Sequence, residues 1–80
     1  MDETKSIDLR GMRCPIPIVE LHMATQDLGE GEELTAIADD PAFCMDVEAW
    51  CRRVGFELMS LDKSDGIQKA VIRKLDAEAA

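Results

Sequence analysis

Aromatic residues and histidine are scarce in this sequence. Its 80 residues include one tryptophan, two phenylalanines, one histidine and no tyrosine. A chain of this length buries only about 60% of the surface that its unfolded form exposes, so it has room for one aliphatic core and no deep cavity. The sequence therefore predicts a single domain over residues 1–80, with a core from about 5 to 75, frayed ends, and chemistry at the surface.

Basic residues are also few. The sequence has nine lysines and arginines against 17 aspartates and glutamates, which gives a net charge of -8. A protein that grips a phosphate backbone needs a basic face, so direct nucleic-acid binding is disfavoured and basic proteins are better partners. The acidic N-terminus is followed by no signal-peptide segment, and no apolar run approaches the ~20 residues of a membrane span. We expect a cytoplasmic protein without a membrane span.

The three cysteines form no metal-binding pattern. Cys14, Cys44 and Cys51 contain no Cys-x-x-Cys pair, and His22 is the single histidine. Zinc sites need four such ligands at short spacings, so no metal and no bound cofactor are expected. Cys51 lies within the apolar pattern of a helix, which favours a core position.

The hydrophobic pattern predicts four strands and two helices. The strands are expected at residues 6–10, 34–38, 56–61 and 67–75. The helices are expected at residues 15–28 and 41–54, each opened by a proline and closed by a glycine. Their buried stripes would be Ile18, Leu21, Thr25 and Leu28 in the first, and Phe43, Val47, Trp50 and Val54 in the second. The order β-α-β-α-β-β predicts an α+β two-layer sandwich, with both helices packed on one face of a four-stranded mixed sheet.

The run Cys14-Pro15-Ile16-Pro17 is the strongest candidate for a site. If Cys14 caps the first helix, Pro15 and Pro17 are its first and third residues and lack N–H groups. The amides of Cys14 and Ile16 are then free to point toward the sulfur. A helix N-terminus also lowers the pKa of a cysteine, because it stabilises the thiolate. This interpretation predicts an exposed, reactive thiolate at position 14.

Two further features bear on that thiolate. Arg10 and Arg13 are local cations in an acidic chain, and either stabilise the thiolate or are ordinary surface charges. Pro17 occupies the position that holds the resolving thiol of a redox Cys-x-x-Cys motif. A persulfide on Cys14 would therefore meet no thiol within its own motif, which suits carrying sulfur better than oxidising thiols.

The same residues resemble a known family. The segment Asp8-Leu9-Arg10-Gly11-Met12-Arg13-Cys14-Pro15-Ile16-Pro17 is similar to the signature of the TusA/SirA-like sulfur carriers. Residues 38–42 and 55–74 match that family in position and type, and the family's β-α-β-α-β-β fold agrees with the pattern above. Many members have an acidic residue at the position of Ile16 and a more basic first helix, so the choice of partner is expected to differ.

The resemblance implies a sulfurtransferase of the relay type. Cys14 matches the cysteine that bears sulfane sulfur as a transient persulfide, with no other cofactor. The implied donor is a cysteine desulfurase or a rhodanese-like protein, and the implied acceptor is another protein thiol. Thiolation of tRNA, molybdenum cofactor synthesis and sulfur oxidation are the implied pathways.

Two other functions stay open at this point. The chain could be a regulatory or adaptor module that binds a protein without sulfur chemistry. It could also be a thiol redox protein that pairs Cys14 with Cys44, which shares a helical face with Cys51. A secondary thiol role for Cys44 is compatible with the carrier hypothesis too.

Overall fold

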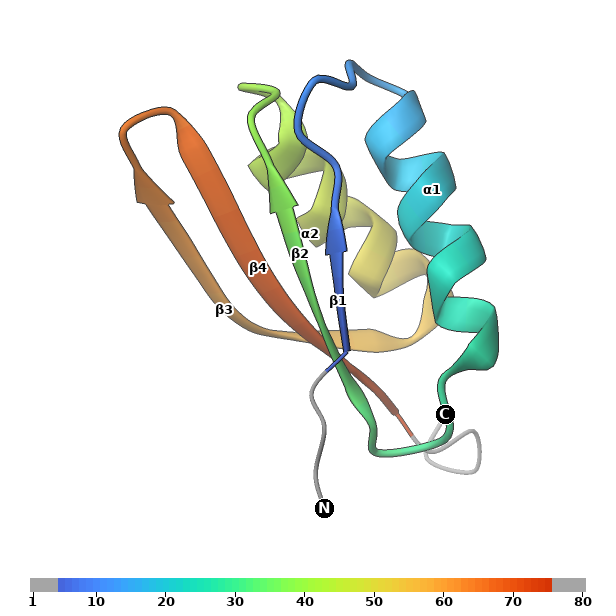
Figure 1. The fold of residues 1–80 in the computed structure, drawn as a ribbon. Helices are drawn as coiled ribbons and strands as arrows, with labels where there is room; N and C mark the ends of the chain where they lie inside the picture. The colour runs from blue at the N-terminus through green and yellow to red at the C-terminus, as the bar shows by residue number, and fades with distance from the viewer. Residues whose placement is uncertain (1–4, 76–80) are drawn as a thin grey trace.

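The computed structural model describes residues 5–75. Its elements, in chain order, are β1 (Lys5–Asp8), α1 (Ile16–Ala24), the short 3-10 helix η1 (Thr25–Asp27), β2 (Glu33–Ala38), α2 (Phe43–Val54), β3 (Phe56–Ser64) and β4 (Ile67–Lys74). The strands form one sheet in the order β1-β2-β4-β3, in which β1 and β2 are parallel and the other neighbours antiparallel. Both helices cover the same face of this sheet (Figure 1). The predicted two-layer α+β fold with a mixed sheet is confirmed.

Alternating burial along β2 explains why the helices lie on one face only. Leu34, Ala36 and Ala38 are buried, while the residues between them are half-buried. On β4, Ala70 pairs with Ala36 and is also buried. Because side chains alternate between the two faces of a strand, these residues all point toward the helices, and the three small alanines let the helices approach closely.

The hairpin between β3 and β4 has the predicted turn. Ser64 pairs with Ile67, which leaves the two-residue loop Asp65-Gly66. Both loop residues have positive φ, 52° and 80°. That combination is typical of a type I′ turn, which matches the twist of antiparallel strands. Strand β3 extends to Ser64, three residues beyond the predicted end.

Helix α1 is shorter than predicted. It begins at Ile16 and passes into η1 at Thr25, whose hydroxyl donates a hydrogen bond of 2.7 Å to the carbonyl of His22. Such a bond from a threonine side chain competes with regular helical geometry. The predicted stripe is confirmed for Leu21, Thr25 and Leu28, which are buried, whereas Ile18 is only half-buried against the core.

Helix α2 begins at Phe43, two residues later than predicted, and its buried stripe differs from the prediction at one position. Phe43, Val47 and Trp50 are buried as expected, but Val54 is 40% exposed. Val54 lies at the last helical turn, on a groove between the helices, and Cys51 fills the core in its place. The expectation that Cys51 is a core residue is therefore confirmed.

The ends of the chain fall outside the described residues. The expected fraying concerns residues 1–4 and 76–80, which are not described. Within residues 5–75, no helix is long and apolar enough to span a membrane.

Candidate functional site at Cys14

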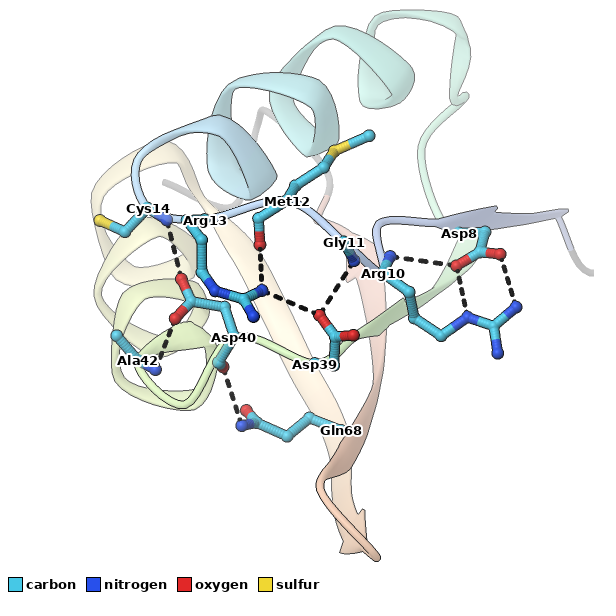
Figure 2. A network of polar contacts seen from close by, with 10 residues as sticks. All are labelled: Asp8, Arg10, Gly11, Met12, Arg13, Cys14, Asp39, Asp40, Ala42 and Gln68. Carbon is cyan, nitrogen blue, oxygen red and sulfur yellow. Dashed lines mark hydrogen bonds and ion pairs between the residues drawn. The ribbon is translucent and has the colours of Figure 1, made fainter.

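The candidate site lies where β1 and β2 end, because parallel neighbours deliver their carboxyl ends to the same edge of the sheet. The loop after β1 carries Cys14, and the turn after β2 carries Asp39 and Asp40. Gly11, at φ 86°, donates its N–H to Asp39 Oδ1 at 3.0 Å. The two segments are thus joined side by side by hydrogen bonds (Figure 2).

Asp40 is the centre of this junction. Its Oδ2 accepts the N–H of Cys14 at 2.8 Å, and its Oδ1 accepts the N–H of Ala42 at 3.2 Å. Its backbone carbonyl accepts a bond of 3.0 Å from Nε2 of Gln68 on β4 (Figure 2). Asp40 is only 6% exposed, and Gln68 Oε1 has no partner among the described residues. The bond between Asp40 and Cys14 joins two segments that lie 26 residues apart, and the hydrophobic pattern of the sequence gives no sign of it.

The start of α1 corrects the predicted capping arrangement. Pro15 is the N-cap and Pro17 the second helical residue, so Cys14 precedes the cap and joins Pro15 through a cis peptide bond. The Cys14 amide donates to Asp40, and the Ile16 amide donates to the carbonyl of Arg13 at 2.9 Å. Neither amide serves the sulfur, because both already have backbone or carboxylate acceptors.

The two arginines also have other partners. Arg10 donates from Nε and Nη2 to the two carboxylate oxygens of Asp8, at 2.9 and 2.8 Å. Arg13 Nη1 contacts Asp39 Oδ1 and the carbonyl of Met12, each at 3.1 Å. The bonds from Arg10 lower the pKa of Asp8 to about 2. Each cation is therefore paired with a carboxylate, at the end of β1 or in the turn after β2, rather than left free for the thiolate.

The predicted lowering of the Cys14 pKa is wrong. A hydrogen bond to the Asp46 side chain is the main cause that raises the pKa of Cys14, followed by partial burial and the charges of Asp46 and Asp40. A nearby negative charge disfavours a second one, so the protonated thiol is the favoured form. The site in the free protein is an exposed thiol surrounded by acids.

The other cysteines are less accessible. All three cysteines are free; Cys14 is exposed, Cys44 half-buried and Cys51 buried. Burial raises the pKa of Cys51 to about 11, with a smaller contribution from the charge of Glu48. Residues 5–75 contain no group of three His, Cys, Asp or Glu side chains that could hold a metal ion.

An apolar surface begins beside Cys14. Ile16, Val19 and Met23 follow one face of α1 and are 46%, 47% and 61% exposed. Val19 and Met23 also line an open groove of about 350 Å³ between α1 and α2, with Ile18, His22, Trp50, Arg53 and Val54. We call Ile16, Val19, Met23 and Val54 the apolar stripe; single exposed apolar residues are ordinary, but a continuous set marks a contact surface.

The fold and this cysteine loop agree with one protein family. The family model described as Sulfurtransferase TusA matches residues 5–74, which include the whole Cys14 loop and both helices. The chain belongs to this family. The TusA match confirms the resemblance that the Arg-Gly-x-x-Cys-Pro-x-Pro segment indicated.

Individual relatives agree with the family assignment. A "Putative sulfur carrier protein" of Halobacterium salinarum is 35% identical over 74 residues, covering 91% of each chain. A protein of the same description from Neisseria meningitidis is 31% identical over 70 residues, which span 88% of this chain and 95% of the relative. The crystal structure of a SirA-like protein from Desulfitobacterium hafniense superposes with a TM-score of 0.77 at 26% identity, over 91% of this chain and all of the other.

Proposed function

We propose that this TusA-family protein carries sulfane sulfur as a persulfide on Cys14 and relays it to a thiol of another protein. The observation that carries the proposal is the exposed Cys14 thiol on a loop held by Asp39 and Asp40, within the segment that matches the family. Pro17 three residues later is consistent with this role, because it leaves no resolving thiol in the motif.

Loading and unloading are the same reaction in opposite directions. The Cys14 sulfur, after losing its proton, attacks the outer sulfur of a persulfide on the donor. The donor's S–S bond breaks, its inner sulfur leaves as a thiolate, and a persulfide remains on Cys14. In unloading, an acceptor thiolate attacks the outer sulfur and Cys14 leaves as the thiolate. No oxidant or reductant is needed, since sulfane sulfur is transferred without net oxidation.

The proposed partners are proteins. The family resemblance suggests a cysteine desulfurase or rhodanese-like donor and a second carrier as acceptor, in tRNA thiolation, molybdenum cofactor synthesis or sulfur oxidation. The apolar stripe supports docking of such a protein, because it starts two residues from Cys14 and continues into the groove between the helices. A partner seated there would bring its own thiol toward position 14.

Sulfur loading is tested by mass spectrometry of the intact protein. After incubation with glutathione persulfide, we expect the mass to rise by one sulfur atom and to return to its original value with a reductant. Cys44→Ser is the matched control and should load as wild type does. If Cys14→Ser gains sulfur as readily as wild type, the proposed carrier residue is wrong.

The adaptor hypothesis is the second candidate, and the apolar stripe is also what favours it. An adaptor would bind its partner through the stripe without any sulfur transfer. Partner binding unaffected by Cys14→Ala, together with no sulfur loading of wild type, would favour this role.

A further inference from the structure

Asp46 lies beside the Cys14 thiol because hydrogen bonds hold the two segments together. The Asp40 carboxylate bridges the amides of Cys14 and Ala42, at 2.8 and 3.2 Å. The carbonyl of Ala42 in turn accepts the amide of Asp46 at 3.0 Å, within the first turn of α2. Cys14 is therefore held over that turn, and the Asp46 side chain contributes most to raising the pKa of its thiol.

No cation of the described residues balances this carboxylate. The charged groups near Cys14 on its own loop are Arg10 and Arg13, which pair with Asp8 and Asp39. The groups that α2 and the turn before it present to Cys14 are Asp40 and Asp46. Asp46 is half-buried, and no ion pair to it occurs within residues 5–75. Deprotonation of Cys14 thus places a second negative charge next to an existing one.

We propose that Asp46 keeps Cys14 in its thiol form in the free protein, and that a cationic side chain of the docked donor or acceptor pairs with Asp46 and frees the thiolate. This inference rests on the proposed function, since it assigns the control of the same cysteine. It also specifies a property of the partner protein, which should have a lysine or arginine beside the partner's own sulfur-bearing cysteine.

The same pairing would assist both directions of transfer. During loading, the Cys14 proton goes to solvent or to the departing donor thiolate, and Cys14 then attacks the outer sulfur. During unloading, Cys14 is the leaving group, and a thiolate with a lower pKa leaves faster. A cation at Asp46 lowers the cost of the negative charge on Cys14 in each case. Without a partner, the carrier still reacts with small thiol reagents and gives up its sulfur to reductants, but it does both more slowly than when a cation is paired with Asp46.

The first test measures how fast iodoacetamide, a neutral reagent, alkylates Cys14 as a function of pH, with the modified peptide quantified by mass spectrometry. In Asp46→Asn we expect the midpoint of the profile to move to lower pH by at least about half a unit. That shift corresponds to about a threefold higher rate at a pH below both midpoints. The matched control is Asp27→Asn, which removes the same charge from η1 at the opposite end of α1. Its profile should equal that of wild type, because about ten residues of helix separate it from Cys14 by more than a Debye length.

The second test supplies the cation. The reaction of Cys14 with cystamine, a cationic disulfide, is compared with its reaction with 3,3′-dithiodipropionate, an anionic one. Cys14 attacks one sulfur of the disulfide, the S–S bond breaks, and the other half leaves as a thiolate, so both probes report the same step. We expect wild type and Asp27→Asn to favour cystamine strongly, and Asp46→Asn to lose at least about half of that ratio.

Two results would overturn the proposal: an Asp46→Asn profile that matches wild type, or a cystamine ratio that Asp46→Asn leaves unchanged. If Asp46→Asn does not fold, the ratio for wild type is measured over a salt series, and a ratio that does not fall with salt overturns the proposal. Neither probe carries sulfane sulfur. Failure of the carrier role would therefore appear only in the persulfide-loading experiment, and failure of the Asp46 role only here.

Discussion

The carboxylate of Asp40 accepts the backbone N–H of Cys14 at 2.8 Å. The loop that carries the cysteine is therefore held by a residue of the turn that follows β2. Because Asp40 also accepts the Ala42 amide, one buried side chain satisfies two backbone donors. The position of Cys14 thus depends on Asp40 as well as on its neighbouring prolines.

Replacing Asp40 should therefore destabilise the protein. In Asp40→Ala, the partly buried Cys14 and Ala42 amides lose their acceptor, and an unsatisfied donor costs up to about 1–3 kcal/mol. Urea denaturation should show that loss in the free energy of unfolding. Asp62→Ala, on the exposed surface of β3, is the control and should change it little. An Asp40→Ala protein as stable as wild type would mean that water replaces the carboxylate.

Arg10 should have little influence on Cys14. Its guanidinium is bound by Asp8, and the pair is exposed on the loop. We expect Arg10→Gln to leave the pH profile of Cys14 alkylation unchanged. A profile moved to higher pH by one unit or more, about a tenfold effect on the thiolate fraction, would restore a thiolate-stabilising role for this arginine.

Cys51 should make stability depend on pH in the alkaline range. Its pKa is raised in the folded protein, from the ordinary value of 9.0 to about 11, because burial disfavours the thiolate. The stability that the neutral thiol contributes is complete below pH 9 and is lost as the pH rises toward 11. Between pH 9 and 11, the free energy of unfolding should fall less steeply with pH in Cys51→Ala than in wild type. Cys44→Ala is the comparison, and identical slopes for wild type and Cys51→Ala would contradict the prediction.

The apolar stripe should affect sulfur transfer from protein donors but not from small-molecule donors. In Met23→Asp, a charge stands at the most exposed position of the stripe on α1, where a docked partner would have to desolvate it. We expect sulfur transfer from a protein donor to slow by at least about tenfold, which is the effect of 1.4 kcal/mol. Loading from glutathione persulfide should be unchanged. Equal slowing with both donors would place the defect in Cys14 itself rather than in docking.

The hairpin turn offers a test of the fold. Gly66 has a φ of 80°, and a non-glycine residue in the left-handed region costs about 1–2 kcal/mol. Gly66→Ala should lower the free energy of unfolding by about that amount. Asp65→Gly, at the neighbouring position with φ 52°, should cause no such loss. A loss of the same size in both variants would argue against a conformational cause.

The fold could be predicted because its signals are local and repeat along the chain. The spacing of Leu21, Thr25 and Leu28 places them on one helical face, and the Ser64-Asp65-Gly66 segment contains the residues of a tight turn. Helix boundaries were less certain: Pro15 is compatible with the cap as well as with the first helical turn, and the structure uses it as the cap.

The site was predictable only in part, because its electrostatics come from distant residues. The exposure of Cys14 and the absence of a resolving thiol follow from its own segment. The sign of the pKa shift does not, because it is set by Asp46 and Asp40 on another segment. Nearby arginines suggested a stabilised thiolate, but Asp39 and Asp8 bind them. Pairing of β1 with β2, which sequence periodicity does not specify, brings these acids to Cys14.

That parallel pairing also determines how the site could be transplanted. The cysteine comes from the loop after β1, and the acids that set its charge come from the turn after β2 and the helix that follows. Grafting only the Cys-Pro-Ile-Pro segment onto another scaffold would move the nucleophile without the groups that control its proton. The smallest transferable unit is two adjacent parallel strands with both of their following segments.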